Sequence, residues 1–142
     1  MSSVVSATTR FFQGNQAKRD SYLTRAGLLL GEASSAFSAG KLEDAVELSY
    51  QAALRTAGAY LATARLPKKR RQPGGAWGQL AGVDDFGDQW ANKFRSYSTL
   101  RSRLITGLPV RYTPADVRDL LTLAGEFLDQ VEGVDLGTGI AA

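Results

Sequence analysis

The basic run between residues 65 and 71 is the stretch whose residue types most directly suggest binding chemistry. Its five cations are Arg65, Lys68, Lys69, Arg70 and Arg71. Such a cluster can neutralise phosphates and release their counterions, which predicts contact with RNA or another phosphate-bearing ligand. Two other uses stay open: a solvated loop that aids solubility, or a pairing with the acidic segment 116–142 of the same or a neighbouring subunit.

Nucleophilic and metal chemistry, by contrast, lack their usual residues. The 142 residues include no histidine and no cysteine, so no Ser–His or Cys–His pair can form. Structural zinc sites are built from the same two residue types. Gly74, Gly75, Gly78 and Gly82 do not have the spacing of a phosphate-binding or dinucleotide-binding loop. We therefore expect no catalytic residue, no metal and no cofactor.

The composition is that of a single globular domain. Hydrophobic residues make up 44% and charged residues 22% of the chain, and the net charge of +3 is too small to indicate nucleic acid by itself. No apolar run approaches the ~20 residues that span a bilayer, and the N-terminal segment lacks the apolar core of a secretory signal. We expect a soluble, cytoplasmic protein that does not contact the membrane.

Apolar residues recur at three- and four-residue steps in four segments, which predicts four helices. The first three are 16–39, 42–66 and 84–106. The fourth opens with Thr113 as N-cap and Pro114 as first residue, and Gly133 closes it. Gly40 and Gly107 suit the ends of the first and third helices, because glycine tolerates the left-handed conformation found there.

These helices predict an all-α fold, an antiparallel four-helix up-and-down bundle with short connections. The stretch "AWGQLAGV" adds a short helical turn between the second and third helices and places Trp77 and Leu80 in the core. Trp90, in the helix 84–106, is also predicted to lie in the core. We expect a flexible N-terminal segment at 1–15, one bundle at 16–133 and a flexible tail at 134–142.

The second half of the helix 42–66 is apolar on nearly every side. A helix of this kind must be covered on every side. Part of that cover would come from the bundle itself, and the rest from another molecule that approaches closely over small residues. Gly58, Ala59 and Ala62 are therefore the predicted contact with a second copy or with a partner protein.

Four blocks in a characteristic order carry a resemblance to a known family: "LLLGEASSAFSAGKLEDAVELSYQAALRTAGAYLA", "AWGQLAGV", "WANKFRS" and "DVRDLLTLAGEFLDQVE". Together they make residues 20–133 resemble the HEPN superfamily, in a small stand-alone branch found in actinobacteria. The resemblance implies a helical bundle that often forms dimers, in a family of which many members bind or cleave RNA. Cleaving members carry an arginine followed a few residues later by histidine, a motif that this chain cannot complete.

Three functions follow from these features. The first is a non-catalytic helical interaction module, homodimeric, that assembles with itself or with a partner protein. The alternative is a module that binds RNA or a phosphate-bearing ligand through the basic run 65–71. The third is a ribonuclease that works with arginine and tyrosine in place of histidine.

Overall fold

The computed structural model describes the backbone of residues 7–64 and 75–134, and the side chains from residue 14 onward within those ranges. All regular structure in these ranges is helical, which confirms the all-α prediction. The elements are α1 (Ala7–Ser38), α2 (Leu42–Thr63), α3 (Gly75–Ala81), α4 (Asp85–Thr106) and α5 (Pro114–Glu132). The short α3 is the predicted extra turn between the second and third long helices.

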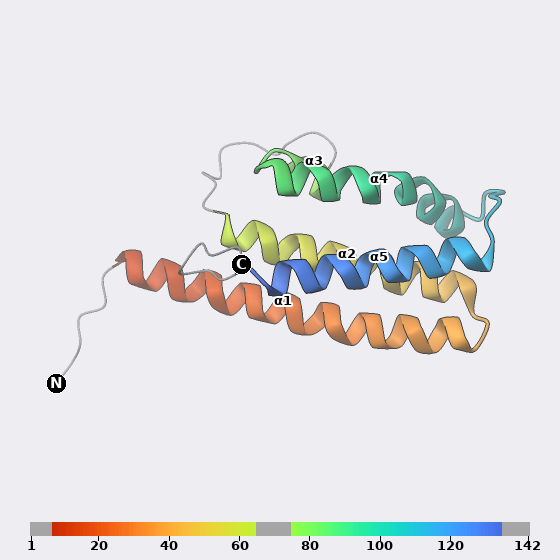
Figure 1. Ribbon diagram of the computed structural model, residues 1–142, viewed down its shortest axis with the longest axis horizontal. Coiled ribbons are helices and arrows are strands. Elements are labelled where there is room, and N and C mark those ends of the chain that lie inside the picture. Colours follow the sequence, from red (N-terminus) through yellow and green to blue (C-terminus); the bar gives the residue numbers. More distant parts are fainter. Residues whose placement is uncertain (1–6, 65–74, 135–142) are drawn as a thin grey trace.

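The four long helices form the expected up-and-down bundle (Figure 1). Helices α2 and α5 run in the same direction and contact each other at its centre. Helix α1 packs against both of them on one side, while α3 and α4 lie on the opposite side. Consequently the α1–α2 turn and the α4–α5 connection lie at the same end of the bundle.

The predicted helix ends are confirmed by their local geometry. Gly40 and Gly107 both have positive φ angles, 76° and 70°, which a residue with a side chain rarely adopts. At the start of α5, the Thr113 hydroxyl accepts a hydrogen bond from the Asp116 amide, and the Asp116 carboxylate accepts one from the Thr113 amide. This reciprocal arrangement is a capping box, and Pro114 follows it as the first helical residue.

Two predicted boundaries are wrong. Helix α1 begins at Ala7 and not at residue 16, so the expected boundary between a flexible segment and the bundle falls inside a helix. No proline interrupts this stretch, and the helical cost of Gly14 is only about 1 kcal/mol relative to alanine. Helix α2 ends at Thr63 and not at residue 66, because the backbone of Ala64 is extended, with φ −78° and ψ 119°.

Small residues account for the close packing of α1 against α2. Of all helix pairs these two are in the most extensive contact. Both helices bury alanines completely, namely Ala26, Ala33, Ala45, Ala52 and Ala59. Side chains this small allow two helix backbones to approach closely. The small apolar residues that the sequence places on α2 are therefore used largely within the chain.

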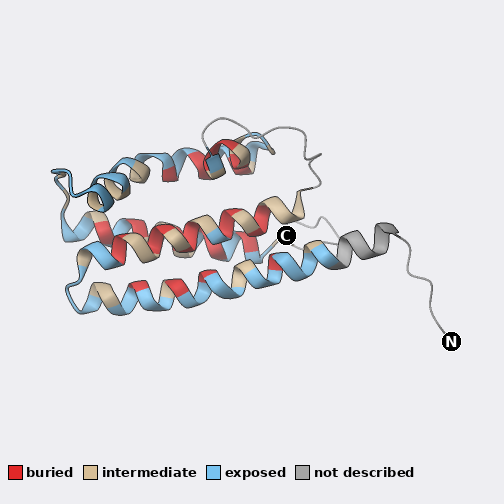
Figure 2. Ribbon diagram, turned by 180° about the vertical axis from the view of Figure 1, so that it is seen from behind, coloured by how far each residue is buried: buried red, intermediate tan, exposed pale blue. Residues whose placement is uncertain are grey.

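Large rings fill the opposite side of the core. Trp77 stacks on Phe94 with ring centroids 4.9 Å apart, and Trp90 stacks on Phe127 at 4.8 Å. The two tryptophans are 5% and 7% exposed, which confirms their predicted core positions. Figure 2 shows the buried residues on the inward sides of the helices, whereas the outward side of α1 is exposed.

A buried cation ties α1 to the end of α5. The Arg19 guanidinium donates hydrogen bonds to the carbonyls of Val131 and Val134, at 3.1 and 2.8 Å. A positive charge in this place complements the partial negative charge of a helix C-terminus. None of the described helices combines the length and the apolar character that a membrane crossing requires.

Candidate functional site

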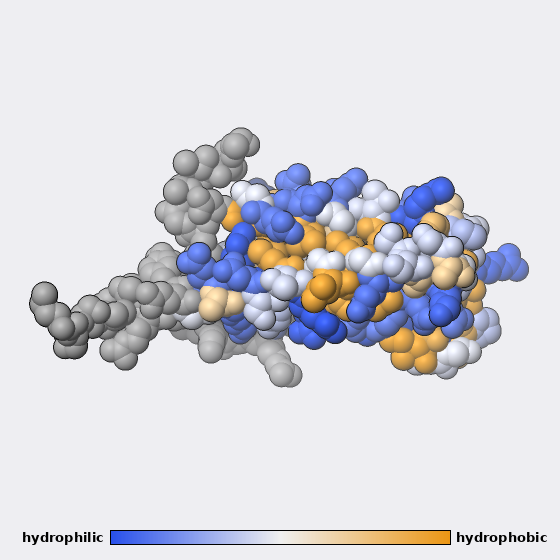
Figure 3. Space-filling model, turned by 90° about the horizontal axis from the view of Figure 1, so that it is seen from below, coloured by the Kyte–Doolittle hydropathy of each residue, from blue (hydrophilic) through white to orange (hydrophobic). Residues whose placement is uncertain are grey.

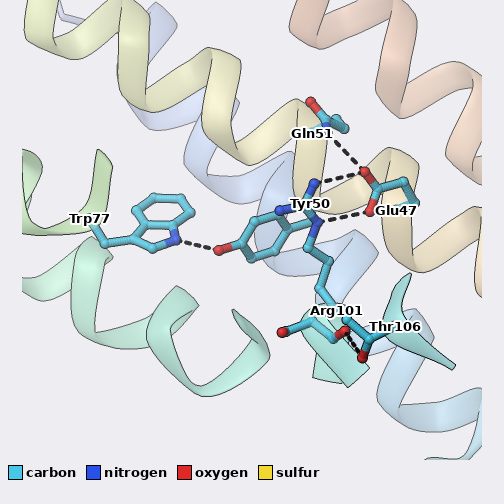
Figure 4. Close-up of polar contacts among 7 residues, drawn as sticks. Glu47, Tyr50, Gln51, Trp77, Arg101 and Thr106 are labelled. Carbon is cyan, nitrogen blue, oxygen red and sulfur yellow. Dashed lines mark hydrogen bonds and ion pairs between the residues drawn. The ribbon is translucent and has the colours of Figure 1, made fainter. Parts of the chain in front are cut away.

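The strongest polar contact between helices joins Glu47 of α2 to Arg101 of α4. The Arg101 Nε donates to Glu47 Oε2 at 2.9 Å, and its Nη2 donates to Glu47 Oε1 at 3.0 Å (Figure 4). This two-pronged geometry matches the planar guanidinium to the planar carboxylate. The Glu47 side chain is 37% exposed and that of Arg101 is 28% exposed, so the pair lies at the surface edge of the core.

Three further side chains extend this contact into a polar cluster, defined here as Glu47, Tyr50, Gln51, Trp77 and Arg101. Gln51 Nε2 donates to Glu47 Oε1 at 2.9 Å. The Arg101 guanidinium lies 5.0 Å from the centroid of the Tyr50 ring, within the range of a cation–π contact. Trp77 Nε1 donates to the Tyr50 hydroxyl at 2.7 Å. The polar cluster thus connects α2, α3 and α4, as Figure 4 shows.

These contacts fix the charge of the cluster. The hydrogen bond from Arg101 lowers the pKa of Glu47 below its ordinary value, with a smaller contribution from Gln51, while burial acts in the opposite direction. The same hydrogen bond raises the pKa of Arg101. Both groups therefore stay ionised at neutral pH. A carboxylate held by three hydrogen bonds is a poor proton acceptor, so this arrangement favours a structural role over acid–base catalysis.

Two open hollows flank Glu47 on the outer side of α2. The larger measures about 580 Å³ and is lined by Ser35, Ala36, Ala39, Lys41, Asp44, Glu47 and Leu48. The smaller measures about 90 Å³ and is lined by Glu43, Asp44, Val46, Glu47, Arg101, Leu104 and Ile105. Because Asp44 and Glu47 line both, the hollows are neighbours. Within the described ranges, no group of three His, Cys, Asp or Glu residues could hold a metal ion.

Three large apolar side chains of the described residues are exposed. Leu28 on α1 is 57% exposed, Ile105 near the end of α4 is 59% exposed, and Leu108 in the α4–α5 connection is 54% exposed. Figure 3 shows apolar side chains along the middle of the face seen from the α1 side. A second apolar group lies at the end of the bundle that holds the α1–α2 turn.

The structure describes some of the site residues predicted from the sequence and not others. Arg65, Lys68, Lys69, Arg70 and Arg71 lie outside the described residues. Ala59 is completely buried within the chain. A methyl group built on Gly58 would lie 3.3 Å from the Tyr22 ring of α1, and Ala62 is half-buried. Helix α1 therefore supplies much of the cover that the sequence assigned to another molecule.

The polar cluster itself was not predicted. Sequence periodicity places Glu47 on the wet side of α2 and Arg101 near the end of the next long helix, as ordinary charges. The two lie 54 positions apart, so no local spacing rule relates them. The opposite charges on two amphipathic helices were the available signal, but they do not determine which residues meet.

One comparison with known proteins gives a clear result. A family model described as an HEPN-like domain matches residues 36–132, which is more than half of the chain. The matched stretch runs from the end of α1 to the end of α5 and includes the whole polar cluster and most residues lining both hollows. The comparisons with curated proteins and with solved structures gave no match.

Proposed function

The chain belongs to the HEPN superfamily through its HEPN-like domain, and on this premise we propose that it is a non-catalytic interaction module that pairs with a second copy of itself. The observation that carries this proposal is the exposure of Ile105 and Leu108, at one end of the bundle, to more than half of their maximum. Ile105 also lines the smaller hollow, and exposed apolar side chains that gather in one place are a feature of interaction surfaces.

The polar chemistry of the described residues supports the absence of catalysis. Glu47 and Arg101 are the most closely engaged charged pair, and each satisfies the other. The Tyr50 hydroxyl is buried and already accepts a hydrogen bond from Trp77. No nucleophile lies in this cluster beside a base that could activate it, which a covalent mechanism requires. The cluster instead holds α4 against the bundle.

The mass of the particle in solution tests the proposal. Multi-angle light scattering on a dilution series should give twice the 15.2 kDa mass of the chain at the higher concentrations. A mass of one chain at every concentration up to ~100 µM contradicts the proposal. A dimer with a micromolar Kd, which needs a binding free energy of only about −8 kcal/mol, would already be largely formed at that concentration. Because the protein itself makes the contact, the dimer mass should be the same after nuclease treatment and after addition of a metal ion.

Binding of a polyanion is the second candidate function, and one observation favours it. The exposed side of α4 carries Lys93, Arg95 and Arg103, and no acidic residue lies between Gln89 and Arg111. Phosphate contacts would make affinity fall steeply with salt. Lys93→Ala/Arg95→Ala on α4 should then weaken binding of labelled single-stranded RNA, and so should the triple substitution Lys69→Ala/Arg70→Ala/Arg71→Ala in the basic run. No binding by the parent chain at ~50 mM salt removes this candidate.

A further inference from the structure

We propose that the second copy docks at the end of the bundle that holds the α1–α2 turn, with Ile105 of each copy filling the larger hollow of the other. This inference rests on the proposed function, since it names the surface through which the pairing occurs. The contact is isologous: the same residues act on both copies, related by a two-fold axis. We call this surface the end surface. It comprises Ser35, Ala39, Lys41, Glu43, Asp44, Ile105, Leu108 and Arg111.

Apolar side chains that project from the chain supply the first half of the end surface. Ile105 occupies the last turn of α4, and Leu108 follows it just after the left-handed Gly107. The Leu108 amide donates to the Arg103 carbonyl at 2.9 Å, so the backbone that carries both side chains is fixed. Rigid apolar side chains bind at a lower entropic cost than mobile ones.

The larger hollow supplies the complementary shape. Ala36, Ala39 and Leu48 form the apolar part of its lining, and Ser35, Lys41, Asp44 and Glu47 form the polar part. Ile105 borders the smaller hollow, and that hollow adjoins the larger one across Glu47. A surface with a projecting aliphatic side chain beside a partly apolar hollow can receive a copy of itself, because two-fold rotation can place each projection over the hollow of the other copy.

The charges of the end surface also favour a second copy over a partner of a single charge. Lys41 and Arg111 are exposed cations, and Glu43 and Asp44 are exposed carboxylates. Glu43 and Ile105 line the same smaller hollow, which places the end of α4 close to the start of α2. Equal numbers of opposite charges let two copies pair, whereas a surface of one sign would repel its own copy.

The contact that the sequence predicts on α2, at Gly58, Ala59 and Ala62, is less suited to this role. Arg55 lies 6.0 Å from the centroid of the Tyr22 ring, and the same ring covers Gly58. Ala59 is completely buried by the chain itself. A partner that approached Gly58 would have to displace Tyr22 of α1, while the end surface is already open in the single chain.

Single substitutions of exposed leucine and isoleucine residues test whether the two copies meet at the end surface. Ile105→Glu and Leu108→Glu should each raise the dimer Kd at least about tenfold, because a carboxylate would be desolvated in the contact. Leu28→Glu is the matched control, since Leu28 is similarly exposed but lies outside the end surface, about two turns before Ser35 on α1. It should leave the mass unchanged. If the parent chain is a dimer and only Leu28→Glu makes it a monomer, the pairing runs through α1 and the end surface is wrong.

Charge reversal by mixing tests the two-fold arrangement and does not depend on a single substitution. Glu43→Lys/Asp44→Lys makes the end surface basic, and Lys41→Glu/Arg111→Glu makes it acidic. Each variant alone should be a monomer, and an equal mixture of the two should restore the dimer mass. Circular dichroism should show that both fold. Two variants that still dimerise separately overturn the end surface while leaving the proposed pairing intact, and a monomeric parent chain overturns both.

Discussion

Glu47 and Arg101 are held together by two parallel hydrogen bonds although they lie 54 positions apart on different helices. The pair is the main charged link between α2 and α4, and the Tyr50 ring lies against the guanidinium. Its position matters for the account, because Glu47 lines both hollows and Arg101 lines the smaller one. The ion pair therefore stabilises the wall of the surface through which we expect the chain to assemble.

A double-mutant cycle should detect this link. Glu47→Gln and Arg101→Met should each lower the free energy of unfolding, and the coupling between them should be about 1 kcal/mol, near the upper end for partly exposed pairs. Urea denaturation at neutral pH gives all four values. A matched cycle between Arg95 and Asn92, which share one exposed hydrogen bond along α4, should give a smaller coupling. Equal couplings in both cycles would show that the Glu47–Arg101 geometry adds nothing.

Acid should weaken the same link. Because the folded-state pKa of Glu47 lies below its ordinary value of 4.5, its stabilisation is complete above that value and is lost as pH falls through the folded-state pKa. The parent chain should therefore lose more stability than Glu47→Gln between about pH 5 and about pH 3. Parallel pH profiles for the two proteins would contradict a lowered pKa.

Alkali should act on a second contact, at the opposite end of α2. The Tyr60 hydroxyl donates to the Asp84 carboxylate at 2.5 Å, and burial followed by this hydrogen bond raises the pKa of Tyr60 above its ordinary value of 10.0. The resulting stabilisation is complete below that value and is lost as pH rises towards the folded-state pKa. Between about pH 9 and about pH 11, Tyr60→Phe should lose less stability than the parent chain, as measured by urea denaturation.

The packing of α3 on α4 depends on one glycine. A methyl group at Gly87 would lie 2.1 Å from the carbonyl oxygen of Leu80, which is backbone and cannot move aside cheaply. Gly87→Ala should lower the free energy of unfolding by roughly 1–3 kcal/mol. Gly31→Ala is the control, because nothing lies within 4 Å of a methyl group there, and it should raise stability by about 0.5–1 kcal/mol. Thermal unfolding should therefore show a lower melting temperature for Gly87→Ala and a higher one for Gly31→Ala than for the parent chain.

Local sequence signals predicted the helices and most of their ends well. Gly40, Gly107 and Thr113 could be placed because a helix stop or start depends on the conformation and hydrogen bonds of a few adjacent residues. The early start of α1 was missed because a frayed segment and a helix can have the same polar composition. Trp77 and Trp90 were placed in the core correctly, since large rings in amphipathic helices are normally buried.

The candidate site could be predicted only in part, because it depends on which helix faces meet. Periodicity showed that the second half of α2 needs cover, but it could not identify Tyr22 of α1 as the cover of Gly58. It also gave no sign that Ile105 would remain exposed, because the same spacing suits a core position or an interface. The basic run from Arg65 to Arg71 stays a prediction, since it lies outside the described residues.

Cysteine cross-linking can show whether Ile105 of one copy lies over the larger hollow of another, because the chain contains no cysteine of its own. Ser35→Cys and Ile105→Cys are mixed in equal amounts, oxidised at low concentration and separated without reductant. We expect a cross-linked dimer that contains one chain of each variant and forms faster than in a mixture of Leu28→Cys with Ile105→Cys. If the Leu28 mixture cross-links as fast or faster, Ile105 does not lie over the larger hollow of a second copy.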